Sequence, residues 1–231
     1  TADPGMAELG IGLVPPVHQT QQPVQLFFVW CAANIGILGV VYGAVIVSFG
    51  LSFWQAILAA VAGVASFALV GITSIAGKIG RTTTLTLSRV IFGKRGNIAP
   101  TSFCWVNLMG WEAVNIITGT LTLVALFAAM GFEESLTTTA LSLFLFGGLT
   151  VLVSVLGQNA VLMMQKWITR IFGAMTLLVV IYLLFTADWQ AILALPSGSW
   201  LTGFLPAVSI IAAGTGISWA IAGADYSRDQ R

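Results

Sequence analysis

One acidic side chain and two amides interrupt a long apolar stretch in the middle of the chain. The stretch from Ile98 to Met130 contains a single charged residue, Glu112, and Asn107, Trp111 and Asn115 lie close to it. An indole presents a flat face for stacking, and a primary amide offers two hydrogen-bond donors and one acceptor. These residue types suit the recognition of a flat, polar heterocycle.

Helical spacing would bring these side chains to one face. Residues four apart share a face of an α-helix, so Asn107, Trp111, Asn115 and Gly119 form one stripe. Glu112 lies three residues before Asn115 and borders that stripe. We expect Trp111 and Asn115 to contact a ligand, with Gly119 leaving room beside them. Asn107 is more typical of a residue that hydrogen-bonds a neighbouring helix.

The composition indicates an integral membrane protein. Of the 231 residues, 58% are hydrophobic and 7% are charged, whereas soluble domains carry about 25% charged residues. Residues 9–77 contain no Asp, Glu, Lys or Arg. A surface that faces water cannot be built from such a sequence. The net charge of +1 and the absence of a basic stripe give no basis for nucleic-acid binding.

Six segments are long and apolar enough to cross a membrane as helices, which takes about 20 residues each. These spans are residues 25–49, 53–77, 98–130, 137–156, 160–187 and 201–224. Residues 1–24 form a tail before them, and residues 225–231 follow the last span. The sequence therefore predicts an all-α integral membrane protein with six transmembrane helices.

The positive charges predict the orientation of the spans. With the N-terminal tail in the cytoplasm, the inner segments hold all nine Lys and Arg residues, and the outer loops hold Glu133, Glu134 and Asp188. We therefore expect the tail and residue 231 to be cytoplasmic, in a multi-pass protein of the plasma (inner) membrane. The inner loop 78–97 is either a short interfacial helix that meets anionic lipid head groups or a solvated turn.

Glycines interrupt the first and sixth spans at corresponding places. Gly36 and Gly39 lie in WCAANIGILGVVYGA, and Gly214 and Gly216 lie in AAGTGISWAIAGA. Unwound backbone persists in lipid only where it lines a cavity, and paired glycine-interrupted spans point to the central site of a transporter. Spans one and six run in opposite directions, which predicts an inverted repeat. The alternative is that these glycines only allow close helix packing.

Two further residues join the candidate site on this interpretation. Ser218 and Trp219 follow the glycines of span six, and the second indole could close the other side of a stacked ring. Glu112, as an acid within a span, is a functional candidate by default. It is either a protonatable coupling group or a structural acid held by Ser, Thr or Trp neighbours.

The chain resembles the nucleobase–cation symporter-1 family, and within it the purine/cytosine permease branch. WCAANIGILGVVYGA is similar to the family's Trp-x-(Ser/Ala)-Ala-Asn motif, and LMGWEAVNIITG to its Gly-Trp-x-x-x-Asn pattern. GISWAIAGADYSR is similar to its Trp-x-x-x-(Ala/Ser)-x-Asp-Tyr ending. Each motif is short, but their order, spacing and topology agree over the whole chain.

The resemblance implies a LeuT-type fold of two inverted five-helix repeats in which helices one and six are broken. It implies uptake of a nucleobase coupled to H⁺ or Na⁺, with no other cofactor and no metal. Carried over, Trp111 and Trp219 sandwich the base and Asn115 hydrogen-bonds it.

The break in span one, near Ala32, Ala33 and Asn34, would contribute backbone carbonyls to the substrate or cation site. We assign Ala33, Gly36 and Glu112 to cation coupling, although no family role maps onto this glutamate.

Two departures from the family qualify this picture. Many members of the branch have Ser where Ala32 stands, so a hydroxyl contact is missing here. The sequence also ends after span six, so we expect it to be the N-terminal half of a truncated chain. The missing C-terminal half would be its partner and would complete the site.

We predict a secondary active transporter, surrounded by membrane lipid, that imports cytosine or purines by cation symport and alternating access. It is not expected to be an enzyme, because the sequence has no nucleotide-binding glycine loop, metal-ligand spacing or Ser-His-Asp set. One alternative is a permease of the same fold for hydantoin, allantoin, uracil, thiamine or an amino acid. Another is a non-transporting polytopic membrane subunit, in which Glu112 and the amides only hold helices together.

Overall fold

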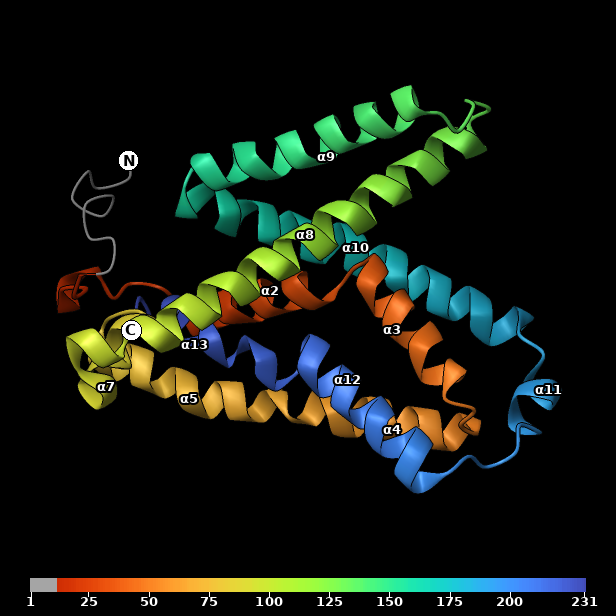
Figure 1. The fold of residues 1–231 in the computed structure, drawn as a ribbon, viewed down its shortest axis with the longest axis horizontal. Helices are drawn as coiled ribbons and strands as arrows, with labels where there is room; N and C mark the ends of the chain where they lie inside the picture. Colours follow the sequence, from red (N-terminus) through yellow and green to blue (C-terminus); the bar gives the residue numbers. More distant parts are fainter. Residues whose placement is uncertain (1–11) are drawn as a thin grey trace.

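The structure is a computed structural model that describes residues 12–231, and its regular elements are helices (Figure 1). Within these residues, five helices are long and apolar enough to cross a membrane, and one bent pair makes a sixth span. The described range has no strand, only an isolated bridge between Gln21 and Gln230. The prediction of an all-α membrane protein is confirmed, and counting the bent pair as one span gives the expected six.

The six spans follow the predicted order. Span one is α2 (Pro23–Asn34) with α3 (Ile37–Ser48), and span two is α4 (Phe53–Ala65) with α5 (Phe67–Gly80). Spans three, four and five are the single helices α8 (Ile98–Ala129), α9 (Leu136–Val155) and α10 (Gln158–Thr186). Span six comprises the π-helical turn η2 (Trp200–Phe204), α12 (Leu205–Thr215) and the 3₁₀ turn η3 (Ile217–Ile221), and α13 (Gly223–Ser227) follows it.

Loops that the predicted topology places on one side lie toward one end of the structure (Figure 1). The tail end holds residues 12–22, the turn between α9 and α10, the last residues, and the loop that forms α6 (Thr84–Leu87) and α7 (Arg89–Gly96). The opposite end, called the α11 end, holds the turn between α3 and α4, the loop between α8 and α9, and α11 (Trp189–Leu193). The loop 78–97 is thus largely helical, as one of its two interpretations expected.

Span one is broken where the sequence predicted. Helix α2 begins at Pro23, whose fixed φ and missing N–H fit the first turn of a helix. It ends at Asn34, and the extended backbone of Ile35 and Gly36 leads into α3. The two halves are bent by 57°. The break therefore exposes helix ends in the interior of the span.

Span six is also broken, and span two supports the break. Gly216 leaves the helical region, with φ −105° and ψ −122°, and separates α12 from η3. The N–H of Ile217 donates to the Ser66 hydroxyl at 3.1 Å, and that hydroxyl donates to the Gly63 carbonyl at 2.6 Å. Ser66 itself joins α4 to α5. The serine at the junction of α4 and α5 in span two thus provides a hydrogen-bond acceptor for the backbone N–H that follows the break in span six.

Small residues allow spans two and six to pack closely along their length. Ala59 on α4 and Ala207 on α12 are completely buried. A Cβ added to Gly63 would lie 2.6 Å from the Cβ of Ile211, and one on Gly77 would lie 2.5 Å from the Cα of Ala224. Side chains larger than hydrogen at these two glycines would force the spans apart.

Hydrogen bonds at the tail end join the N-terminal segment to spans two and six. The Gln19 amide donates to the carbonyls of Lys78 and Arg228, at 3.0 Å each. The Asp225 carboxylate accepts from the backbone N–H of Thr84 at 3.0 Å and from its hydroxyl at 2.7 Å. Asp225 therefore anchors the start of α6 to the end of span six, where its charge also suits a helix N-terminus.

At the α11 end, one buried glutamine holds the loop before span six. The Gln55 side chain donates to the Gly198 carbonyl at 3.0 Å and accepts from the Gly198 N–H at 2.8 Å. Gln55 is 5% exposed and also belongs to the capping box that Ser52 forms at the start of α4. One side chain thus satisfies both backbone polar groups of a residue in a distant loop.

Replacing Gln55 with alanine should destabilise the protein. The Gly198 N–H and carbonyl would lose their partners, and unsatisfied polar groups of this kind cost about 1–3 kcal/mol each when buried. We expect a clearly lower melting temperature for Gln55→Ala in detergent. Gln190→Ala, at an exposed glutamine on α11, is the matched control and should leave it unchanged. Equal melting temperatures for the two variants would contradict this role.

Candidate functional site

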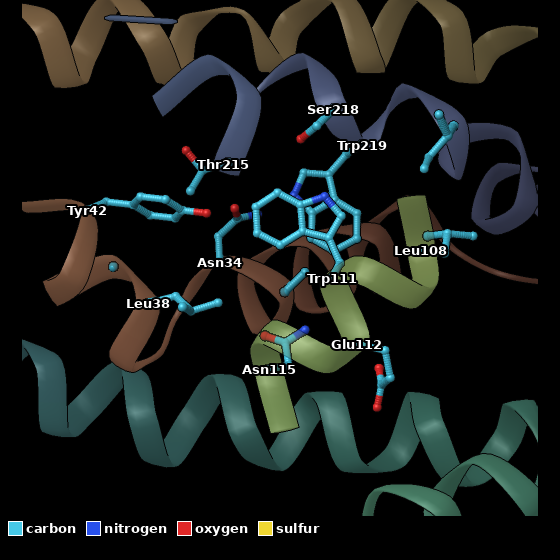
Figure 2. Close-up of a pocket in the computed structure, with 14 residues that line it drawn as sticks. Asn34, Leu38, Tyr42, Leu108, Trp111, Glu112, Asn115, Thr215, Ser218 and Trp219 are labelled. Carbon is cyan, nitrogen blue, oxygen red and sulfur yellow. The ribbon is translucent and has the colours of Figure 1, made fainter. Parts of the chain in front are cut away.

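A cavity of about 240 Å³ lies where the broken parts of spans one and six face helix α8 (Figure 2). Its lining comes from three separate stretches of the sequence: Ala33, Asn34, Leu38, Gly39 and Tyr42 of span one; Leu108, Trp111, Glu112 and Asn115 of α8; and Gly214, Thr215, Ser218, Trp219 and Ile221 of span six. Its volume is slightly below the range of about 300–1,000 Å³ that is usual for ligand pockets, so only a small ligand would fit.

Helix α8 contributes the stripe that its spacing predicted. Trp111 and Asn115 both line the cavity, one turn apart. The Trp111 indole projects among the side chains from spans one and six (Figure 2). Asn115 makes no side-chain hydrogen bond within residues 12–231, so both ends of its amide are available.

Glu112 borders the cavity, but its carboxylate points away from the indoles (Figure 2). The residue is exposed, and its carboxylate has no hydrogen-bond or salt-bridge partner in the described part of the chain. The alternative of a structural acid held by Ser, Thr or Trp neighbours finds no such contact here.

The break in span six brings a hydroxyl and an indole to the cavity. The Thr215 hydroxyl is already used, since it donates to the Ile211 carbonyl at 3.1 Å. The Ser218 hydroxyl has no partner among the described residues. The Nε1 of Trp219 is buried, also without a partner. At the cavity, the span-six polar atoms without a partner among the described residues thus belong to Ser218 and Trp219, the two residues that the sequence had indicated.

The break in span one places an amide and a phenol at the cavity. Asn34, the last residue of α2, donates its Nδ2 to the carbonyl of Trp30 at 2.8 Å. Tyr42, on α3, directs its hydroxyl toward the centre of the cavity (Figure 2). Its ring lies against Gly214 so closely that a Cβ there would collide with it.

Trp30 does not line this cavity, but it contacts a residue that does. Its ring makes edge-on contacts with Phe67, Trp219 and Tyr226, at centroid distances of 5.3, 5.8 and 5.4 Å. Edge-to-face pairs at such distances add about 0.5–1.5 kcal/mol each beyond the area they bury. Trp30 thereby links span one to span two, to the break in span six, and to α13.

Three of the predicted site residues do not line the cavity. Ala32 lies about 200° around α2 from Asn34, on another face. Gly36 forms the break itself, and nothing lies within 4 Å of the position of its missing Cβ. Gly119 is buried against the ring of Phe146 on α9, so it allows close helix packing and does not make room for a ligand. The stripe on α8 extends further than the cavity does.

Tyr42 is the main lining residue that the sequence reasoning missed. Its position follows Gly39 by three residues on α3, so helical spacing alone puts both on one side. The signal was a single aromatic residue with a polar tip inside a glycine-rich span. Without the position of span six, nothing distinguished it from a lipid-facing tyrosine.

A cavity with a mostly apolar lining and a few polar side chains, set between two broken spans of a multi-pass membrane protein, is the arrangement of a permease. The chain belongs to the family described as permeases for cytosine/purines, uracil, thiamine and allantoin, whose family model matches residues 13–229. The membership expected from the three motifs is confirmed. No curated protein and no solved structure gave a significant match.

Adding one methyl group to Gly214 should disturb the cavity through Tyr42. In Gly214→Ala the new Cβ collides with the phenol ring, and such overpacking typically costs about 1–3 kcal/mol. We expect a lower melting temperature for Gly214→Ala. Gly110→Ala is the control, because its Cβ would meet nothing within 4 Å.

A double variant tests whether the tyrosine is responsible. Tyr42→Ala should destabilise the Gly214→Ala protein less than it destabilises the wild type, because in that background loss of the phenol ring also removes its collision with the new Cβ. Additive losses in melting temperature would show that the two residues do not interact.

Proposed function

We propose that this protein is a secondary active transporter that imports a nucleobase, cytosine or a purine, by cation symport and alternating access. The observation that carries the proposal is the meeting of Trp111 and Asn115 with Ser218, Trp219 and Asn34 at one cavity. These residues come from three spans, and membership of the permease family makes a transported ligand the natural occupant.

The chemistry of the cavity favours a neutral, flat ring. Two indoles offer stacking faces, and the amides and hydroxyls match the donors and acceptors at the edge of a base. The single charged lining residue, Glu112, turns its carboxylate away from the indoles. A cationic ligand such as thiamine or a zwitterionic amino acid would lack a charged partner among the indoles. Uracil, allantoin and hydantoin remain alternatives of the same chemical kind.

We further propose that the tail end is cytoplasmic and that the membrane is the plasma (inner) membrane. The segments 78–97 and 228–231, which carry Lys and Arg residues, lie at the tail end, whereas the loops that carry Glu133, Glu134 and Asp188 lie at the α11 end and contain no Lys or Arg. This asymmetry is what the positive-inside rule describes. The cavity would then receive its ligand from the α11 side and release it past Trp30.

Replacing Asn115 with alanine should reduce the affinity for the base. A hydrogen-bonding group lost from a binding site typically costs about 1–3 kcal/mol, or roughly 5- to 150-fold. We expect labelled cytosine uptake with a KM raised about 5- to 150-fold, in cells that lack their own permeases and express the complete reading frame. Hypoxanthine and hydantoin serve as competitors.

Asn107→Ala is the matched control for this experiment. It removes the same side chain from the same helix, outside the cavity lining, and should transport with nearly unchanged KM at equal amounts in the membrane. Saturable uptake with the same KM in both variants would overturn the assignment of Asn115. A well-folded wild type that takes up none of these compounds would overturn the proposed function.

The coupling ion is proposed to be H⁺ or Na⁺, with the break near Ala33 and the carboxylate of Glu112 as the candidate groups. Uptake into membrane vesicles should fall severalfold when one gradient is removed and the other kept. Replacing Na⁺ by K⁺ at constant pH tests the first ion, and dissipating the pH gradient at constant Na⁺ tests the second. Uptake that survives both treatments would exclude symport with either cation.

A further inference from the structure

The loop between spans two and three carries an apolar patch that no other part of residues 12–231 covers. Val90, Ile91 and Phe92 follow one another on α7 and are 86%, 80% and 53% exposed. The remaining residues of α7 are exposed as well. Three consecutive large apolar side chains in an exposed loop indicate an interaction surface. The α7 segment (residues 89–96) therefore presents apolar side chains to a partner outside the described chain.

Three cations lie in the same eight residues. They are Arg89, Lys94 and Arg95, and none of them makes a hydrogen bond or ion pair within residues 12–231. Gly93, with φ 68°, turns the backbone between the apolar triplet and the last two cations. Residues 78–97 contain no Asp or Glu. The segment thus combines apolar and positively charged side chains and has no counter-charge of its own.

Polar contacts fix both sides of the α7 segment. Asn97, directly after it, is 3% exposed. Its Nδ2 donates to the Leu85 carbonyl at 2.8 Å, and its Oδ1 accepts from the Ser88 hydroxyl. The preceding turn α6 is joined to span six, because the Thr84 hydroxyl donates to the Asp225 carboxylate at 2.7 Å. The exposed side chains therefore belong to a segment that is anchored to the spans.

The level of the α7 segment in the membrane follows from helix α8. This helix begins at Ile98, directly after the segment, and its 32 residues make it about 48 Å long. The hydrocarbon core of a bilayer is about 30 Å thick, so a helix of this length centred in it extends about 9 Å beyond it at each end. Figure 1 shows α7 at the tail end, beside the first turns of α8. The α7 segment therefore lies at the level of the lipid head groups.

We propose that the α7 segment docks into the membrane surface at the tail end and that anionic phospholipid is its partner. Val90, Ile91 and Phe92 enter the boundary between head groups and acyl chains, and the three cations bind lipid phosphates. Charge complementarity selects this occupant, because three unpaired cations beside an apolar triplet match an anionic head group with its acyl chains. Of the two interpretations of residues 78–97, the interfacial one then holds. The proposal does not depend on which ligand the cavity binds.

A spin label at residue 91 tests where the apolar triplet lies. The complete reading frame, in a Cys31→Ala, Cys104→Ala background, carries the label at Ile91→Cys and is placed in vesicles of phosphatidylcholine and phosphatidylglycerol. Oxygen concentrates in lipid, whereas a neutral nickel chelate stays in water. We expect oxygen to relax the label at residue 91 more strongly than the chelate does. Glu134→Cys, in an exposed loop of the α11 end, is the matched control and should show the reverse order.

Lipid charge tests the three cations. The measurement is the melting temperature in nanodiscs of phosphatidylcholine with and without phosphatidylglycerol, which should raise it for the wild type, less so at high salt. The triple variant Arg89→Gln, Lys94→Gln, Arg95→Gln should lose most of this rise, because each cation near an anionic surface strengthens association about fivefold.

Two control variants accompany the triple variant. Exchanging the cations for one another, as Arg89→Lys, Lys94→Arg and Arg95→Lys, keeps the charge and should keep the rise. Lys166→Gln with Arg170→Gln removes two cations from α10 instead and should also keep most of it.

Each result decides the proposal. A label at residue 91 that the nickel chelate relaxes more strongly would show a solvated turn, and a label that neither reagent reaches would show a protein partner. Either outcome would overturn docking into lipid. A phosphatidylglycerol effect of wild-type size in the triple glutamine variant would show that these cations do not bind the phosphates. None of these results bears on uptake through the cavity.

Discussion

The structure depends on one constraint: the backbone polar groups at a break in a membrane span must find hydrogen-bond partners. In lipid an unpaired N–H or carbonyl is costly, so a break in a span needs a partner for the groups it frees. Ser66 supplies one: it accepts from the N–H of Ile217 just after the break in span six and donates to the carbonyl of Gly63. A Cβ at Gly216 would collide with this hydroxyl. The serine and the glycine therefore require each other, and the position of the cavity follows from them.

Close packing makes that hydrogen bond possible. Span two reaches span six only because glycine and alanine residues line their contact, from Ala59 and Ala207 to Gly77. The break in span six thus packs closely against span two. Span one is tied to the same unit through Trp30, whose ring contacts Phe67 of span two and Trp219 of span six. The walls of the cavity are parts of one packed structure, which is what a site with fixed donors and acceptors needs.

The cavity combines fixed and adaptable groups. Asn34 and Trp219 are held by Trp30, whereas Asn115 and Ser218 make no side-chain bonds among residues 12–231.

The sequence by itself determined the class of fold and most of the chemistry at the site. Apolar length specifies spans, because a bilayer has a set thickness. The glycines of spans one and six indicated their breaks, because glycine weakens a helix. The four-residue spacing of Trp111 and Asn115 placed both on one face, because this depends only on the helix itself. These inferences required no knowledge of which helix lies beside which.

Only the tertiary structure decided which face of each span meets which neighbour. Spacing relates residues within one helix but does not fix how that helix is rotated toward its neighbours. A span with apolar residues on all its faces gives little indication of that rotation. Gly119 therefore shared the predicted stripe yet faces Phe146, while Tyr42 was overlooked and lines the cavity. The bonds of Ser66 to Ile217 and of Gln55 to Gly198 join residues more than 140 positions apart. Contacts of that kind arise when spans pack, and no local pattern specifies them.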